Sequence, residues 1–286
     1  MSKIGIIGGS GLYKIEGMEI IKQVAVKTPF GNPSDKFTIG KLEDKDIVFL
    51  PRHGIGHRIS PSEINYRANI FAMKKLGVER IISVTACGSL KEELKPLDFV
   101  VVDQFVDRTN YGREATFFAQ GIVGHIVFSH PVCPQLSGSI YEAGKSLNLN
   151  IHKGGIYLNM QGPQFSTLAE SNLYRSWKMD VIGMTNLAEA KLCREAEICY
   201  ATVACITDYD CWHADHEAVT LEIILSNLAK NTENAKKIIL KIIKELKPQR
   251  HCSCGQALKH AIVTDQKMIP AKTKKDLNII IGKYLK

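Results

Sequence analysis

One apolar run in the second half of the chain, from Ile198 to Ile206, constrains the fold more than any other segment. It is short, carries no charged side chain and is rich in β-branched and aromatic residues, which is typical of a strand buried on both faces. Such strands lie at the centre of α/β sheets, where helices cover both sides. The run therefore predicts an α/β protein with this segment as a central strand.

Other strand-like runs alternate with helical patterns along the chain. These runs are 3–7, 37–42, 47–50, 80–84, 99–102, 156–160 and 180–185. The alternation predicts a mixed, mostly parallel twisted sheet with helices on both faces, and 37–50 indicates a hairpin. No linker divides this pattern, so we expect one domain at 1–247. Residues 248–286 are expected to form a C-terminal appendage, with one short helix, packed on the same domain.

Several polar residues carry the signals of helix starts. Ser60-Pro61-Ser62-Glu63 is a capping-box sequence with proline at the first helical position. Ser166 and Asn186 are expected to cap two later helices. Two further helical patterns, separated near Asn231 to Asn234, are expected to complete the main domain.

Polar or glycine-containing segments follow three of the predicted strands. They are Gly8-Gly9-Ser10-Gly11, Arg52-His53-Gly54 and Thr85-Ala86-Cys87-Gly88-Ser89. In open α/β sheets ligands bind in the crevice outside the carboxyl ends of the strands. Glycine-rich turns expose backbone N–H groups, and a cation with an imidazole also suits an anion. The dinucleotide fingerprint cannot be placed on the first turn, which by itself is also compatible with a plain tight turn.

The central run ends in Thr207-Asp208-Tyr209-Asp210, which places two acids at a strand end. If the strand persists, Asp208 and Asp210 share a face. Burial and mutual repulsion should raise the pKa of both carboxyls, and a protonated carboxyl can donate to a ring nitrogen. A solvated turn is the alternative, because Asp is common in turns.

The overall composition is that of an ordinary globular protein. The net charge of +8 comes largely from lysines late in the chain, and only 7% of the residues are aromatic. Nucleic-acid binding would need stacking aromatics among the basic residues, so no nucleic-acid partner is expected. No apolar run reaches the roughly 18 residues of a membrane span, and the N-terminus has no signal-peptide pattern. We therefore expect a cytoplasmic protein with no membrane partner.

The eight cysteines do not indicate a disulfide framework, because a cytoplasmic location keeps thiols reduced. Cys87, Cys193, Cys199 and Cys205 lie in apolar segments and are expected to be buried small hydrophobes. The segment His251-Cys252-Ser253-Cys254, with His260, could be considered for zinc. It lacks the usual Cys-x-x-Cys spacing, so no metal site is predicted. A disulfide under oxidising or hot conditions remains an alternative for Cys252 and Cys254.

A set of motifs stands in the order seen in one enzyme family. The motifs are Ile6–Leu12, Thr28–Gly31, Arg52–Gly54, Asn65–Ile70, Thr85–Leu90, Asp103–Phe105, Gly162–Thr167, Gly183–Thr185 and Thr207–Trp212. Together they resemble the 5′-methylthioadenosine phosphorylases, in the trimeric branch of the purine nucleoside phosphorylases. The match covers roughly residues 3 to 246, and so many ordered motifs make chance resemblance improbable.

The resemblance implies phosphate-dependent cleavage of the N-glycosidic bond of methylthioadenosine, without a metal or organic cofactor, by a trimer or hexamer. It assigns phosphate binding to Ser10, Arg52, His53, Thr85, Ala86 and Thr185. It assigns substrate contacts to Phe165, Ser166, Met184, Asp208, Asp210 and His125, the last from a neighbouring subunit, and Val219 is a candidate for lining the apolar 5′ pocket. Asp208, together with Asp210, is the catalytic candidate, because adenine leaves readily only if a proton reaches or is shared with its N7.

Two rival functions are left open by the residues. The first rival is a phosphorylase of the same class that prefers 6-oxopurines. Relatives with that preference carry Asn where Asp208 stands. The inosine and guanosine enzymes also carry Glu where Ser166 stands, so both positions here favour adenine. A non-catalytic nucleoside-binding protein on the same fold is the other rival, and it would predict a broken phosphate site. Gln161 and Gly183 depart from the Glu and Asn of some relatives, which affects expected ribose contacts and not the reaction class.

Overall fold

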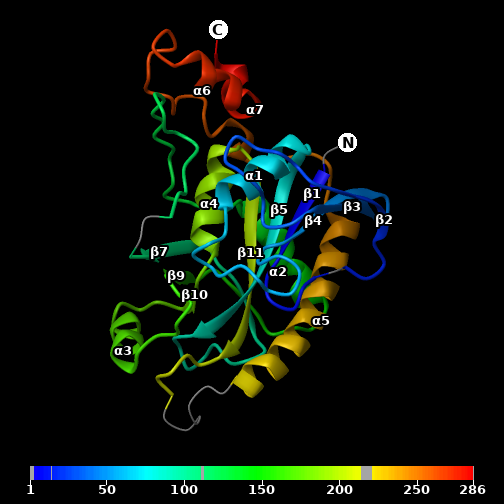
Figure 1. The fold of residues 1–286 in the computed structure, drawn as a ribbon. Coiled ribbons are helices and arrows are strands. Elements are labelled where there is room, and N and C mark those ends of the chain that lie inside the picture. The colour runs from blue at the N-terminus through cyan, green and yellow to red at the C-terminus, as the bar shows by residue number, and fades with distance from the viewer. Residues whose placement is uncertain (1–2, 14, 111–112, 214–220, 286) are drawn as a thin grey trace.

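The predicted central strand lies in the middle of the sheet. In the computed structural model, which describes residues 3–13, 15–110, 113–213 and 221–285, β11 (Cys199–Asp208) pairs in parallel with β5 (Val78–Ser89) from Cys199 to Asp208. Figure 1 shows these two long strands side by side through the core. Both strands are buried along almost their whole length, as expected for a strand covered on two faces.

The remaining strands extend the sheet from this centre. They are β1 (Lys3–Gly8), β2 (Glu19–Val24), β3 (Phe37–Leu42), β4 (Lys45–Pro51), β6 (Phe99–Val101), β7 (Gln104–Arg108), β8 (Ile151–Lys153), β9 (Ile156–Met160) and β10 (Val181–Gly183). One path runs β2-β3-β4-β1-β5-β10-β9-β7, while β11, β6 and β8 branch from β5. Parallel pairs join β1, β4, β5 and β11, and antiparallel pairs occur at β2-β3-β4, β5-β10 and β6-β11. The predicted mixed, mostly parallel sheet and the 37–50 hairpin are confirmed, whereas β2, β7 and β8 were not predicted.

Helices cover both faces of this sheet, as predicted. The helices are α1 (Tyr66–Lys75), α2 (Pro134–Ser146), α3 (Leu168–Ser176), α4 (Asn186–Glu195), α5 (Leu221–Glu245), α6 (Ala271–Asp276) and α7 (Asn278–Ile281). Because side chains alternate along a strand, Ile81 of β5 packs into one apolar cluster with α1, α4 and α7. Its neighbour Ile82 packs into the cluster formed with α2 and α5 on the opposite face.

Helix starts were predicted less well than strands. Ser60 does donate its N–H to the Glu63 carboxylate, at 3.1 Å, but this contact closes a separate turn, and α1 begins at Tyr66. The cap is Asn65, whose side chain accepts from the N–H of Ala68. The capping-box prediction for Ser60 was therefore wrong about the helix, because the same hydrogen bonds can close an isolated turn.

The two later cap predictions are each off by one residue. Thr167, not Ser166, caps α3, and with Glu170 it forms a full capping box. Thr185 occupies the cap position of α4, and Asn186 is the first helical residue. The Asn186 amide instead points into the core, where it donates to the Tyr200 hydroxyl at 2.8 Å.

The break predicted near Asn231 to Asn234 does not exist, because α5 is continuous. Asn231 is fully buried and its amide donates to the carbonyl of Ile206 in β11 at 2.8 Å. The Thr232 hydroxyl donates back to the carbonyl of Leu228, one turn earlier. Polar residues here anchor the helix to the sheet instead of ending it.

Residues after Pro248 contain more structure than the single short helix predicted. A 3₁₀ helix at Ser253–Gln256 precedes α6 and α7, and a second 3₁₀ helix follows at Gly282–Tyr284. Leu258, Ile269 and Ile280 are buried in the same apolar cluster as α1 and α4. In Figure 1 this segment lies at one end of the molecule, beside part of the irregular stretch before α2, whose described residues next to that helix are 113–133. Among the described helices, none combines the length and apolar character needed to cross a bilayer.

Candidate active site

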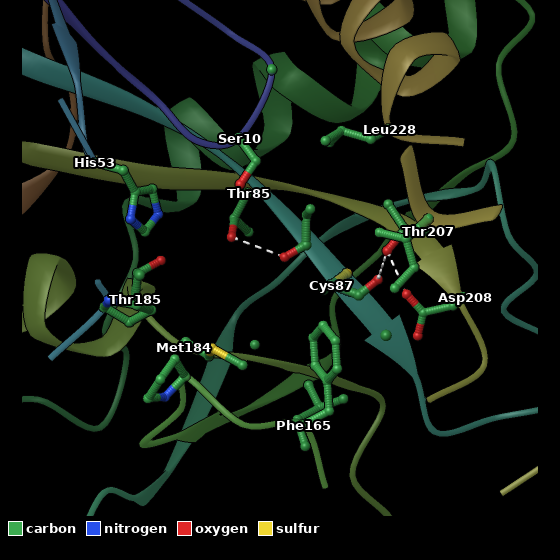
Figure 2. Close-up of a pocket in the computed structure, with 18 of the residues that line it drawn as sticks. Ser10, His53, Thr85, Cys87, Phe165, Met184, Thr185, Thr207, Asp208 and Leu228 are labelled. Atoms are coloured by element: carbon green, nitrogen blue, oxygen red, sulfur yellow. Dashed lines mark hydrogen bonds between the residues drawn. The ribbon is translucent and has the colours of Figure 1, made fainter. Parts of the chain in front are cut away.

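A cavity of about 610 Å³ opens at the carboxyl ends of β1, β4, β5 and β11. Ten of the residues singled out from the sequence line it, namely Ser10, Arg52, His53, Thr85, Ala86, Phe165, Met184, Thr185, Asp208 and Asp210. Figure 2 shows Ser10, His53, Thr85 and Thr185 toward one end, Asp208 with Thr207 toward the other, and Met184 and Phe165 between them. The sheet thus brings together groups that are up to 200 positions apart, as the strand-end argument anticipated.

Arg52 is a buried cation at one end of the cavity. Its Nε donates to Glu189 Oε1 at 2.5 Å, and its Nη2 contacts Ser83 Oγ at 2.5 Å and Glu189 Oε2 at 3.2 Å. Nη1 donates to the carbonyl of Val84 at 3.1 Å. Burial by itself would lower the pKa of Arg52, but the Glu189 carboxylate more than offsets this and raises it. Since a guanidinium has five N–H groups, these described contacts leave one Nη1 hydrogen for a ligand.

His53 follows Arg52 and is held in a defined orientation. Its Nδ1 lies 2.8 Å from the carbonyl oxygen of Ile59, and its ring stacks on His57 with centroids 4.1 Å apart. Burial, with the neighbouring charge of Arg52, lowers the pKa of His53 to about 4. The ring is therefore neutral near pH 7, with Nδ1 as the donor to the carbonyl and Nε2 as an acceptor.

The glycine-rich turn after β1 passes close to β5. A Cβ on Gly9 would lie 2.7 Å from the carbonyl oxygen of Val84 and 2.9 Å from Nη1 of Arg52. Only glycine permits this approach, which places Ser10 at the cavity beside Thr85. β5 does not end at Val84 as predicted but continues to Ser89, so Thr85 and Ala86 lie within the strand.

The two acids occupy the other end of the cavity. Asp208 Oδ2 accepts from the Thr207 hydroxyl at 2.6 Å, and Oδ1 accepts from the backbone N–H of Asp210 at 2.8 Å. Burial raises the pKa of both carboxyls, and the charge of Asp210 adds to the rise at Asp208. β11 ends at Asp208, and Asp210 has a φ of 54°, so a turn rather than a continued strand brings Asp210 to the cavity.

The segment between β9 and α3 lies along the cavity. Phe165 is 65% exposed although it lines the cavity, so its ring has a free face. Ser166 is not a lining residue, but its hydroxyl lies near Asp210 where, after that of Ser171, it opposes the rise in pKa that burial causes. Position 183 requires glycine for a local steric reason, because a Cβ there would lie 1.9 Å from the hydroxyl of Tyr157.

Three groups of functional interest were not found from the sequence. Arg113, from the irregular stretch before α2, donates to the carbonyls of Met184 and Gln161 and so fixes the cavity wall. Glu189 of α4 orients Arg52. Ile224, Leu225 and Leu228 of α5 form an apolar wall, and the amphipathic period of this helix was the signal that could have identified them.

The structure does not bring His125 to the cavity of its own chain. His125 lies in the irregular stretch, where its N–H donates to the carbonyl of Ala261. Val219 lies outside the described residues.

A possible metal-ligating group lies elsewhere in the described part of the chain. Four cysteines, which we call the thiol cluster, have sulfur atoms that all lie within 4.8 Å of one another; they are Cys133, Cys199, Cys252 and Cys254. None of the four lines the cavity.

Comparison with known proteins relates the chain to characterised groups. Residues 3–244 match the model of the phosphorylase superfamily. The S-methyl-5′-thioadenosine phosphorylase of Geobacter sulfurreducens is 54% identical over 99% of both chains. The S-methyl-5′-thioadenosine phosphorylase of Koribacter versatilis is 55% identical over 99% of this chain and 97% of its own.

Solved structures show the same relationship. The crystal structure of a methylthioadenosine phosphorylase from an antarctic soil metagenomic library superposes with a TM-score of 0.92 at 44% identity, over 98% of both chains. A mutant of the adenosine/methylthioadenosine phosphorylase from Schistosoma mansoni, in complex with methylthioadenosine, gives a TM-score of 0.84 at 34% identity. That match covers 91% of this chain and 96% of the other.

Proposed function

The chain belongs to the phosphorylase superfamily, and we propose that it cleaves the N-glycosidic bond of 5′-methylthioadenosine with inorganic phosphate. The products are adenine and 5-methylthioribose 1-phosphate. The observation that carries this proposal is one cavity with a cation and hydroxyls at one end and two buried acids at the other. A nucleoside and a phosphate fill such a cavity with the sugar between its two ends.

Phosphate is the nucleophile and lies at the Arg52 end. The remaining N–H of Arg52 and the hydroxyls of Ser10, Thr85 and Thr185 are its donors, with backbone N–H groups at Ser10 and Ala86. Neutral His53 accepts, through Nε2, the proton of a phosphate hydroxyl. These groups hold the anion beneath the anomeric carbon, and positioning of this kind removes much of the entropic barrier.

The ribosyl group passes through a cation-like transition state, as in other glycosyl transfers. Phosphate stabilises this charge because the site holds the anion close to it. Met184 lies along the sugar, and Arg113 fixes the Met184 carbonyl. The chemistry requires no organic cofactor and no metal at the cavity, because the nucleophile is already anionic and the leaving group needs only a proton.

The base lies at the acid end, between Phe165 and Asp208. Burial raises the pKa of Asp208, so this carboxyl can share or deliver a proton to N7 of adenine. Asp210, whose own pKa is raised by burial, is the partner acid for the exocyclic amine. A carboxylate accepts from a 6-amino group but repels a 6-oxo group, so the pair favours adenine over hypoxanthine.

The 5′ substituent lies against the apolar side of the cavity. Ile224, Leu225 and Leu228 of α5 present hydrocarbon there, and Val219 is a further candidate. A methylthio group gains from this contact, whereas a 5′-hydroxyl would lose a hydrogen-bond partner. We also propose a homotrimer or hexamer, with His125 placed at the 5′ pocket of a neighbouring subunit, since it lies away from the cavity of its own chain.

One assay separates this proposal from its rivals. Release of free base is measured with methylthioadenosine, adenosine, methylthioinosine and inosine, each with and without phosphate. We expect phosphate-dependent release that is fastest with methylthioadenosine. Faster release from the inosine substrates would favour a 6-oxopurine phosphorylase, and binding without release would favour a nucleoside-binding protein.

A further inference from the structure

The thiol cluster draws its four cysteines from three distant parts of the chain. Cys133 precedes the first residue of α2, Cys199 begins β11, and Cys252 with Cys254 flank the start of the 3₁₀ helix after α5. The four sulfur atoms lie within 4.8 Å of one another, and Cys199 Sγ is 3.4 Å from Cys252 Sγ. Four thiols from three separate segments thus lie around one common point.

This spacing matches a single tetrahedral metal ion. Zinc–sulfur bonds are about 2.3 Å, so the sulfurs of a regular tetrahedron lie about 3.8 Å apart. Two disulfides would also use all four sulfurs, but each would hold its pair about 2.0 Å apart, whereas all four thiols are free here and Cys199 Sγ lies 3.4 Å from Cys252 Sγ. An iron–sulfur cluster divides its cysteines between several irons and so holds them farther apart than one ion does. The geometry favours one ion over either alternative.

The surroundings of the thiol cluster suit thiolates. Cys133 stands at the N-terminus of α2, where the helix dipole and the N–H of Leu136 favour negative charge. The guanidinium of Arg250 lies beside Cys199 and Cys252, and it supplies a positive charge near the group. Four thiolates around a divalent cation carry a net charge of −2, which Arg250 partly offsets.

The chain that supplies Cys252 and Cys254 is held in place independently of the cysteines. Gln135, in the first turn of α2, accepts from the N–H of His251 at 3.0 Å and donates to the carbonyl of Gln249 at 3.4 Å. Arg250 donates to the carbonyls of Glu79 and Glu197. These hydrogen bonds of Gln135 and Arg250 hold Cys252 and Cys254 next to Cys133 and Cys199. Structural metal sites require such support for their ligands.

We propose that the thiol cluster binds one zinc ion through its four sulfurs, as a structural site that fastens the C-terminal segment to α2 and β11. Each thiol loses its proton to solvent on binding, so no oxidant or reductant is needed. Cys133, Cys199 and Cys254 are buried and Cys252 is partly exposed, which leaves a route for the ion. All four coordination positions are filled by protein, as in structural and not catalytic zinc sites.

The test uses the full chain, purified under reducing conditions and desalted. Its zinc content is measured by inductively coupled plasma mass spectrometry. We expect about one zinc per chain, and replacement by cobalt should give the visible absorption of tetrahedral cobalt bound by thiolates. Cys252→Ser should lose the ion and lower the melting temperature by several degrees. The matched control is Cys205→Ser, which removes another buried thiol of β11 outside the thiol cluster and should keep the zinc.

If Cys252→Ser does not fold, Cys252→His provides the second variant. Imidazole also binds zinc, so this variant should retain the ion while the sulfur-to-cobalt charge-transfer absorption weakens. The proposal is overturned by a reduced protein that binds neither zinc nor cobalt, by iron with inorganic sulfide in place of zinc, or by disulfides among the four cysteines in unreduced peptides. It is also overturned if Cys205→Ser loses the ion as readily as Cys252→Ser. None of these readouts depends on phosphorylase activity.

Discussion

Arg52 and Glu189 form a buried ion pair at the edge of the cavity, with Nε of Arg52 2.5 Å from Oε1 of Glu189 and both side chains almost fully buried. The cation that our proposal places at the phosphate end is therefore also part of the core. Its planar group is fixed before any ligand arrives, which is the preorganisation that anion binding favours. Substitution of Arg52 should consequently affect stability as well as phosphate binding.

Arg52→Ala should reduce the free energy of unfolding by about 3–5 kcal/mol, because it leaves Glu189 buried without its partner. In the fraction that remains folded at low temperature, the KM for phosphate should rise far more than the KM for the nucleoside. Thermal unfolding and steady-state kinetics measure the two effects. Arg58→Ala is the control, since Arg58 is itself exposed where it pairs with Asp35, and its loss should cost about 1 kcal/mol or less. Equal rises in both KM values would show that Arg52 does not bind phosphate specifically.

Asp208→Asn should lower kcat on methylthioadenosine by about 100-fold or more, the range for a lost general acid. The fold should survive, because the new amide oxygen can accept from the N–H of Asp210 while its nitrogen donates to the Thr207 hydroxyl. The ratio of kcat/KM for 6-amino and 6-oxo substrates should shift toward the 6-oxo group, and Asp210→Asn should show a related shift. An unchanged ratio with full rate would show that Asp208 neither recognises nor protonates the base.

Phe165→Ala should raise the KM for nucleosides roughly tenfold, because an aromatic ring that stacks on a base contributes about 1–3 kcal/mol. The melting temperature should change little, since the ring is 65% exposed. Phe117→Ala is the contrasting control: this ring is buried and does not line the cavity, so its loss should cost about 3–5 kcal/mol of stability. A phosphate KM that rises in parallel with the nucleoside KM would contradict the stacking role of Phe165.

Glu195 should make stability depend on pH. Burial raises the pKa of this carboxyl from 4.5 to about 7, although the Phe117 N–H and the Thr116 hydroxyl oppose the rise. The folded state therefore binds the proton more tightly than the unfolded state does. The stability that Glu195 contributes through this proton is fully present below about pH 4.5 and is lost as the pH rises through about 7. The free energy of unfolding should fall by at most about 3 kcal/mol over this range.

Unfolding free energies of wild type and Glu195→Gln, compared from pH 4.5 to 8, isolate this effect. Gln cannot titrate, so the difference between the two proteins should grow in favour of the variant as the pH rises through this window. The comparison also cancels the contribution of His53, which is present in both proteins. Its lowered pKa acts in the opposite direction, because the folded state holds the imidazole neutral and loses stability as the pH falls toward 4. A difference that does not vary with pH would rule out a titrating Glu195.

The assembly proposal is tested by sedimentation. The chain should sediment as a trimer or a multiple of three, and His125→Ala should raise the KM for methylthioadenosine more than that for phosphate. His260→Ala is a control of the same residue type, since His260 is exposed in the C-terminal segment. A fully active monomer would contradict the placement of His125 in a neighbouring site.

The sequence indicated the sheet well because burial on both faces requires continuous apolar runs, and these are visible without any tertiary information. The run before Asp208 and the segments after β1 and β4 predicted where the cavity lies, because the ends of parallel strands meet at one edge. Helix starts were less predictable. The hydrogen bonds of Ser60 with Glu63 are compatible with both a helix cap and an isolated turn. The Asn186 side chain does not cap α4, because it forms hydrogen bonds inside the core instead.

The sequence by itself determined the fold class, the family and ten of the residues that line the cavity, since these follow from local apolar periodicity and from the resemblance of the ordered motifs. Tertiary structure alone decided which groups support them. Glu189 meets Arg52, Arg113 reaches the Met184 carbonyl, and Cys133 meets Cys254, each across many intervening residues. Spacing along the chain carries no information about such contacts, because they depend on how separate helices and strands pack. For this reason the Cys252-Ser253-Cys254 segment, which lacks the usual Cys-x-x-Cys spacing, predicted no metal site as a sequence, whereas the fold brings Cys133 and Cys199 to it and completes the thiol cluster.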